Sequence, residues 1–263
     1  MTRRCRIIAA LALAVLATAS CASKHKQEGP LPLALKEQVS SVVRSGAGYA
    51  VTWAGVLSNP NRGHFGENAV AVVTAVDAVG KEVVHLEQPL DAAPPGRPLA
   101  FGGQVTAGGQ PVRVKIDYRP ASWRAASRPP SAFLRFPISD VLTEKQPDGS
   151  YLVTGYVLDP FRRTAGALAV TALLRDDAGR LVAGATTYVD DVRPGTKRRF
   201  VITVDGVRGA VGATDVYATT WGSTARAYED LARAGAVPLH TIPPTTAPFV
   251  KDRGYPPYND RRQ

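Results

Sequence analysis

The chain has almost no cysteine or histidine. Two of its 263 residues are cysteines and four are histidines, His25, His64, His85 and His240. No two of these histidines stand at the three- or four-residue spacing with which a helix presents a pair of zinc ligands. An enzyme would have only carboxylates, serine and lysine for acid, base and nucleophile. We therefore predict no catalytic residue, no metal site and no cofactor.

A hydrophobic run long enough to cross a membrane is also missing. Arg3 and Arg4 precede an apolar run over residues 7–19, about 13 residues where a spanning helix needs about 20. Small residues then lead to Cys21, and this order of basic, apolar and small residues is typical of a secretion signal. Residues 16–21 resemble a bacterial lipobox, with Thr18 where a branched apolar residue is usual.

The sequence therefore predicts a signal peptide over residues 1–20, cleavage before Cys21 and lipidation of the Cys21 thiol. The mature chain would be anchored to the extracytoplasmic side of a bacterial cell membrane. Because Cys5 leaves with the signal and Cys21 carries the lipid, no free thiol remains. Disulfides and thiolate metal sites are then excluded together.

Basic residues outnumber acidic residues, 32 to 22. The formal charge is +10, and removal of the signal takes Arg3, Arg4 and Arg6 with it, which leaves +7. A basic surface attracts anionic lipid headgroups and acidic wall polymers. No basic run in the folded part exceeds the three residues 197–199, and no aromatic residues alternate with basic ones. We therefore expect the membrane, through lipid on Cys21, and an anionic wall polymer or envelope protein as partners, and no nucleic acid.

The two halves of the mature chain repeat each other at a spacing of about 100 residues. Turn-forming residues and aromatic residues recur in the same order. The matched pairs are Gly55 with Gly155, Asn59 with Asp159, Pro60 with Pro160, Gly80 with Gly179, Pro95-Gly96 with Pro194-Gly195, Phe101 with Phe200, and Tyr118 with Tyr217. The repeat indicates two copies of one folding unit.

Within each copy, β-branched and aromatic residues form short runs bounded by Gly, Pro, Asn and Asp, which is typical of strands. We predict strands over 49–57, 69–76, 81–87, 98–105 and 112–119, and again over 151–158, 168–175, 181–189, 197–204 and 214–220. A further strand is expected before each set, at 38–44 and 133–144. In the strand at 168–175, one face is apolar and the other, with Thr171 and Arg175, is mixed.

The second copy resembles FxLYD-type domains, small immunoglobulin-like β-sandwiches of bacterial extracytoplasmic proteins. The resemblance rests on Gly155, Asp159-Pro160, the run 176–182, Val192-Arg-Pro-Gly195 and Phe200. The first copy keeps Gly55, Asn59, Gly80, Pro95-Gly96 and Phe101. The Phe-x-Leu-Tyr-Asp string that names the family is absent. The resemblance implies an envelope location and a binding or structural role, and it brings no catalytic residues.

The predicted fold is all-β, with two tandem immunoglobulin-like antiparallel β-sandwiches over residues 36–124 and 131–222. Residues 21–35 are read as a tether. Ser223 is a candidate N-cap for a short helix within 223–235 that stops at Gly235 and docks through Tyr228 and Leu231. The Pro-rich stretch 236–263 is expected to be a disordered tail.

Three tryptophans near strand ends raise the question of a ligand face. Trp53, Trp123 and Trp221 are either core residues or, with Arg119, Arg124 and Arg128, a platform for sugars or acidic polymers. The residues proposed for this face are Trp53, Trp123, Arg124 and Trp221. The sequence thus favours a non-catalytic envelope lipoprotein that binds or scaffolds an envelope component. An envelope enzyme and an accessory subunit of a membrane transport or sensory complex are the alternatives.

Overall fold

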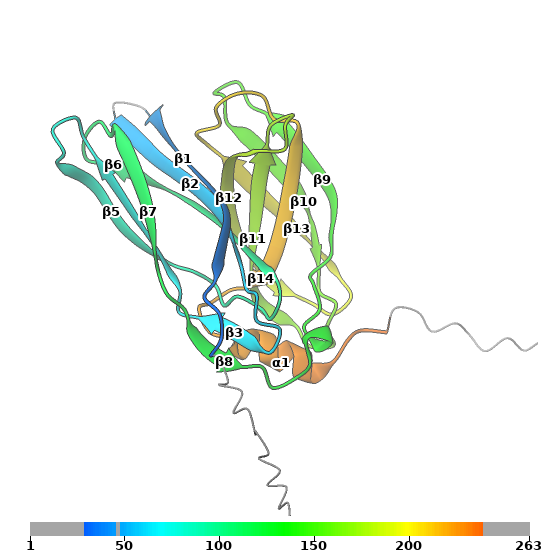
Figure 1. Ribbon diagram of the computed structural model, residues 1–263. Coiled ribbons are helices and arrows are strands. Elements are labelled where there is room, and N and C mark those ends of the chain that lie inside the picture. The colour runs from blue at the N-terminus through cyan, green and yellow to red at the C-terminus, as the bar shows by residue number, and fades with distance from the viewer. Residues whose placement is uncertain (1–28, 46–47, 239–263) are drawn as a thin grey trace, which may run out of the picture.

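The computed structural model describes residues 29–45 and 48–238, and they form antiparallel β-strands with one short α-helix (Figure 1). The strands of the first half are β1 (Ala34–Ser45), β2 (Gly48–Ser58), β3 (His64–Glu67), β4 (Val70–Val76), β5 (Glu82–Pro89), β6 (Pro98–Ala107), β7 (Arg113–Arg119) and β8 (Ser122–Ala125). A 3-10 turn, η1 (Pro130–Ala132), precedes β9 (Ile138–Lys145), β10 (Tyr151–Leu158), β11 (Ala165–Arg175), β12 (Leu181–Val192), β13 (Lys197–Val204), β14 (Ala213–Thr220) and α1 (Arg226–Ala234). The predicted signal peptide, Cys21 and residues 239–263 of the predicted tail lie outside the described residues.

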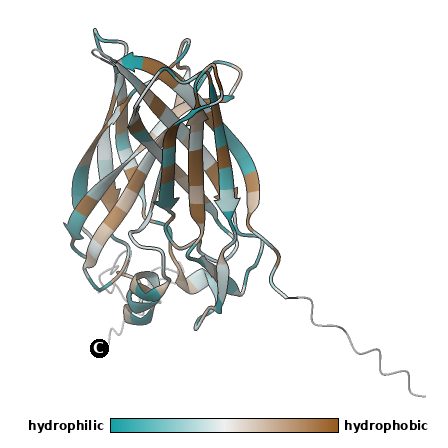
Figure 2. Cartoon of the chain, turned by 90° about the vertical axis from the view of Figure 1, so that its left-hand side faces the viewer, coloured by the Kyte–Doolittle hydropathy of each residue, from teal (hydrophilic) through white to brown (hydrophobic). Residues whose placement is uncertain are grey.

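Each half of the chain forms one sandwich of two three-stranded sheets. In the first half β1-β2-β6 faces β5-β4-β7, and in the second half β9-β10-β13 faces β12-β11-β14. The strands therefore recur in the same order, and all of these pairings are antiparallel. Hydrophobic and hydrophilic bands alternate along the strands in Figure 2, as expected for sheets that bury one face. The predicted all-β fold with two sandwiches is confirmed.

The repeat extends to the packing of single side chains. Gly55 on β2 pairs with Phe101 on β6, and Gly155 on β10 pairs with Phe200 on β13. A Cβ atom on either glycine would lie 2.6 Å from the Cζ atom of the paired phenylalanine. Each buried ring therefore lies over a glycine that leaves it room, and the same contact closes both cores.

The two sandwiches are packed face to face, so that four sheets form four layers. Residues 51–57 of β2 and 168–174 of β11 are buried on both faces, one face toward their own core and the other toward the neighbouring sandwich. Ala54, Ala100 and Leu173 meet at this junction. A Cβ atom on Gly102 would lie 2.9 Å from the carbonyl oxygen of Gly184, so the two backbones approach closely there. The mixed face of the strand at 168–175 is therefore an internal interface.

A charged cluster also crosses the junction. Arg175 on β11 donates to Asp215 (Nε to Oδ2, 2.6 Å) on its own sheet and to Glu37 (Nη1 to Oε2, 2.8 Å) on β1 of the first sandwich. The Arg175 side chain is 16% exposed. The hydrogen bonds from Arg175 lower the pKa of Glu37.

One end of the molecule is closed by β3, β8 and α1 (Figure 1). Tyr228 and Leu231 of α1 are buried, as predicted, and Tyr228 packs among Phe65, Phe133, Phe136 and Phe161. The helix begins at Arg226, and Ser223 is not its N-cap. The Ser223 hydroxyl donates to Asn68 (3.1 Å), and a carboxylate oxygen of Glu67 instead accepts the backbone N–H of Ala225 (2.7 Å). Gly235, with φ of 81°, ends the helix as expected.

Candidate functional site: a cavity with two arginines

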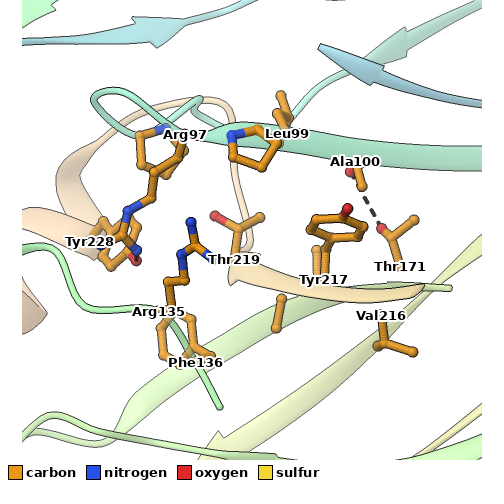
Figure 3. Close-up of a pocket in the computed structure, with 14 residues that line it drawn as sticks. Arg97, Leu99, Ala100, Arg135, Phe136, Thr171, Val216, Tyr217, Thr219 and Tyr228 are labelled. Carbon is orange, nitrogen blue, oxygen red and sulfur yellow. Dashed lines mark hydrogen bonds between the residues drawn. The ribbon is translucent and has the colours of Figure 1, made fainter. Parts of the chain in front are cut away.

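A cavity of about 160 Å³ lies where the two sandwiches and α1 meet (Figure 3). The loop before β6 contributes Arg97, and the segment between η1 and β9 contributes Arg135 and Phe136. Strand β14 contributes Tyr217 and Thr219, and α1 contributes Tyr228. An engineered cavity of about 150 Å³ holds a benzene molecule, so this space suits a chemical group of that size.

The two arginines enter this space from opposite sides (Figure 3). Among residues 29–45 and 48–238, neither Arg97 nor Arg135 has a carboxylate within ion-pair distance. Burial lowers the pKa of Arg97, and the charge of Arg135 lowers it further, although the phenol of Tyr228 acts in the opposite direction. Arginine side chains are cationic in proteins, so Arg97 and Arg135 carry like charges. Arg97 is half-buried and Arg135 is exposed, and an anion between them would relieve their mutual repulsion.

Tyr228 holds Arg97 in place. The Nη1 atom of Arg97 donates to the Tyr228 hydroxyl (3.3 Å), which in turn donates to the carbonyl oxygen of Leu134. Burial raises the pKa of Tyr228 to about 12, so its hydroxyl remains a neutral donor. This hydrogen bond uses one N–H group of the Arg97 guanidinium and orients it. The other N–H groups remain available to bind a ligand.

Thr219 adds an unused hydroxyl to the arginines. Its Oγ1 atom is buried and has no hydrogen-bond partner among the described residues. In Figure 3 this side chain extends toward the same space as Arg135. Because most buried polar atoms in native structures are paired, an unpaired hydroxyl beside two arginines is a place for a ligand oxygen.

The other side of the cavity is apolar. Pro98, Ala100 and Ala169 line it beside the ring of Tyr217, and the nearby Thr171 hydroxyl contacts the carbonyl of Ala100 (3.4 Å). The cavity therefore offers cationic donors on one side and an apolar wall on the other. Such a space fits a carboxylate or phosphate attached to a few carbon atoms.

The structure does not bring the four residues of the predicted ligand face together. Trp53 is 2% exposed in the first core, where its indole N–H donates to Gln88 (2.7 Å), so the prediction is wrong for this residue. Trp123 on β8 is half-buried, and Arg124 lies 3.9 Å from Glu67. Trp221 is 58% exposed and packs edge-on against Tyr188. Trp123 and Trp221 line separate hollows.

Arg97 and Arg135 are not among the residues predicted from the sequence. The signal available was weak: Arg97 follows the Pro95-Gly96 turn that recurs at Pro194-Gly195, where the second copy has Thr196. Nothing in the local pattern marks Arg135. The two arginines meet only because the sandwiches pack against each other and α1 covers the junction.

The described part of the chain contains no group of three or more His, Cys, Asp or Glu side chains placed to hold a metal ion. Within the same residues, no helix has the length and apolar character needed to span a bilayer.

Comparisons with known proteins give little. No family model and no curated protein matches the chain. Among solved structures, the N-terminal CBM22-1-CBM22-2 tandem domain of Xyn10C from Paenibacillus barcinonensis is similar over 74% of this chain and 87% of that one. The identity is 8% and the TM-score is 0.16. A similarity of this size does not indicate a common ligand.

Proposed function

We propose that this protein is a non-catalytic, lipid-anchored component of the bacterial cell envelope that binds an acidic envelope component, a protein or a polymer, through the cavity between its sandwiches. The observation that carries the proposal is the pair of half-buried Arg97 and exposed Arg135, which line one cavity without a carboxylate partner among the described residues. Arginine binds carboxylates and phosphates through two parallel hydrogen bonds. The basic composition and the features around Cys21 support the envelope location.

The packing of the two sandwiches suits a binding role of this kind. Arg97 comes from the first sandwich, and Arg135 and Thr219 come from the second. The junction between them is filled by buried side chains and crossed by the ion pair of Arg175 with Glu37. The segments that carry the binding groups are therefore fixed relative to one another before a ligand arrives, which reduces the entropy lost on binding.

The proposal is tested with the mature chain carrying Cys21→Ser. Two acidic polymers serve as probes, poly-γ-glutamate for carboxylate and poly(glycerol phosphate) for phosphate, and titration calorimetry measures their binding. The double variant Arg97→Gln with Arg135→Gln is expected to weaken binding of the preferred polymer at least ten-fold, because each arginine contributes charge-assisted hydrogen bonds.

The matched control is Arg113→Gln with Lys145→Gln. Both side chains are exposed and unpaired among the described residues, and the same two charges are lost. We expect this control to change the affinity less than three-fold. Equal losses in both variants would mean that the polymers respond only to overall charge, and the proposed cavity function would be wrong.

A further inference from the structure

The end of the molecule closed by β3, β8 and α1 is also where the chain leaves toward Cys21. Leu31 is fixed there by two hydrogen bonds to Asn61, from its N–H to Oδ1 (2.8 Å) and from Nδ2 to its carbonyl oxygen (2.7 Å). We call this the tether end and define it by the segments 29–33, 58–69, 119–137, 158–166 and 221–238.

The distance to the anchor is short. Leu31 is ten positions after Cys21, so a fully extended chain would span at most about 35 Å and a flexible one would average about 17 Å. If Cys21 is lipidated, the tether end is therefore the part of the body that lies next to the bilayer.

At the tether end the arginines are exposed, whereas three of the four carboxylates are turned toward the protein and the fourth, Asp230, is 32% exposed and pairs with Arg233 (2.7 Å). The acidic side chains bond to the protein itself: Asp159 is buried and accepts from Phe161 and Ala165, and buried Glu229 accepts from Ser127. Glu67 accepts from the start of α1. Exposed arginines without a carboxylate partner among the described residues are Arg62, Arg128, Arg162, Arg163, Arg226 and Arg135, the last of which also lines the cavity.

The opposite end has no such excess. Its hairpin turns carry Asp77, Asp148 and Asp176, whose carboxylates accept hydrogen bonds from the turn residues that follow them. The positive field is therefore directed toward the side from which the tether emerges.

Apolar side chains accompany the arginines. Leu31 is 56% exposed and Trp221 is 58% exposed. Trp123 lines a hollow with Pro30, Pro32, Leu33 and Leu35. Tryptophan is enriched at the headgroup level of bilayers because its ring is apolar and its N–H is polar.

We propose that the tether end binds the headgroup region of an anionic bilayer, so that the two sandwiches stand on the membrane with their opposite end turned away. Three features point to an anionic bilayer as the binding partner: the short segment between the body and Cys21, the exposed arginines and the exposed tryptophan. The orientation rests on the lipid anchor of the proposed function, whereas the affinity for anionic lipid does not. Each arginine near an anionic surface contributes about five-fold to the affinity.

The test uses the mature chain with Cys21→Ser, so that any binding comes from the protein surface. Vesicles of phosphatidylglycerol mixed with phosphatidylcholine are compared with pure phosphatidylcholine by co-sedimentation. We expect binding to the anionic vesicles alone, with a blue shift in tryptophan emission. The variant Arg128→Gln, Arg162→Gln, Arg163→Gln and Arg226→Gln should weaken this binding at least twenty-fold.

The matched control removes four charges from the opposite end, through Arg44→Gln, Lys81→Gln, Arg113→Gln and Lys145→Gln, all exposed in the wild type. It should weaken vesicle binding less than five-fold. Equal losses in the two variants, or no binding to anionic vesicles, would contradict the proposal that the tether end binds an anionic bilayer. The cavity variant Arg97→Gln with Arg135→Gln removes one arginine of the tether end, so it should weaken vesicle binding by no more than about five-fold. A loss of polymer binding with vesicle binding retained to this extent separates a failure of the cavity from a failure of the lipid surface.

Discussion

At the scale of single residues, the surroundings of Asp91 oppose its negative charge, and burial raises the pKa of Asp159 in the same direction. Asp91 lies in the loop between β5 and β6 and accepts a hydrogen bond from the backbone N–H of Gly222 (2.7 Å), which joins the two halves of the chain. Burial raises the pKa of Asp91 to about 6, and the hydrogen bond from Gly222 only partly offsets this. The folded protein therefore holds this proton more tightly than the unfolded chain, in which aspartate titrates near 3.9.

This difference fixes the sign of a pH dependence. Asp91 stabilises the fold only when it is protonated, so its contribution is present below about pH 4 and is lost as the pH rises to about 6. In Asp91→Asn the neutral amide oxygen still accepts from Gly222. We expect the free energy of unfolding of the variant to be about 1–3 kcal/mol higher than that of the wild type at pH 7. At pH 4 the two values should be equal. Urea denaturation at the two pH values measures this.

Asp190→Asn is the control, because Asp190 is exposed on β12. Its free energy of unfolding should differ from that of the wild type by the same small amount at both pH values. An Asp91→Asn effect of one size at pH 4 and pH 7 would contradict the raised pKa.

At the scale of elements, the repeated glycine–phenylalanine pairs determine how tightly each sandwich closes. In Gly155→Ala the new Cβ atom would lie 2.6 Å from the Cζ atom of Phe200, which is 2% exposed and has little room to move. We expect a loss of about 1–3 kcal/mol in the free energy of unfolding, as for other overpacked cores.

Gly166→Ala on β11 is the matched control, because nothing lies within 4 Å of its added Cβ atom. It should change the stability by less than about 0.5 kcal/mol. Phe200→Leu placed in the Gly155→Ala background should recover part of the loss. If the two alanine variants are equally stable, the ring does not depend on the glycine.

The elements that the sequence predicts are the ones with a complete local pattern. Residues 151–158 and 197–204 are runs rich in β-branched and aromatic residues bounded by turn residues, and β10 and β13 have these same bounds. The four-residue strands β3 and β8 were missed, because neither is long enough to show a period and each forms only by pairing with the other. The start of α1 was misplaced because Asn68, distant in sequence, binds the hydroxyl of Ser223.

The candidate site was beyond prediction for a related reason. Arg97 and Arg135 lie on loops of different sandwiches, and no spacing relates them. The ambiguous pattern of residues 168–175 was the available clue that the sandwiches pack together, since a strand buried on both faces loses its alternation.

At the scale of the whole molecule, Arg175 is the charged link between the sandwiches. Its removal in Arg175→Met leaves Glu37 and Asp215 without their cation, although both carboxylates retain some contact with water, at 29% and 44% exposure. Because solvent reaches them, the loss should be smaller than for a fully buried pair, about 1–3 kcal/mol. Urea denaturation at pH 7 measures it.

Arg180→Met is the control for this link. Arg180 forms an ion pair with Asp176, but its side chain is 80% exposed, so its loss should cost less than about 1 kcal/mol. The lowered pKa of Glu37 adds a second readout. Its stabilisation is present above the pKa of an unfolded glutamate and is lost as the pH falls through the folded value. Acidification should therefore reduce the stability difference between wild type and Arg175→Met, and a difference that does not depend on pH would mean that Arg175 joins the sandwiches by packing alone.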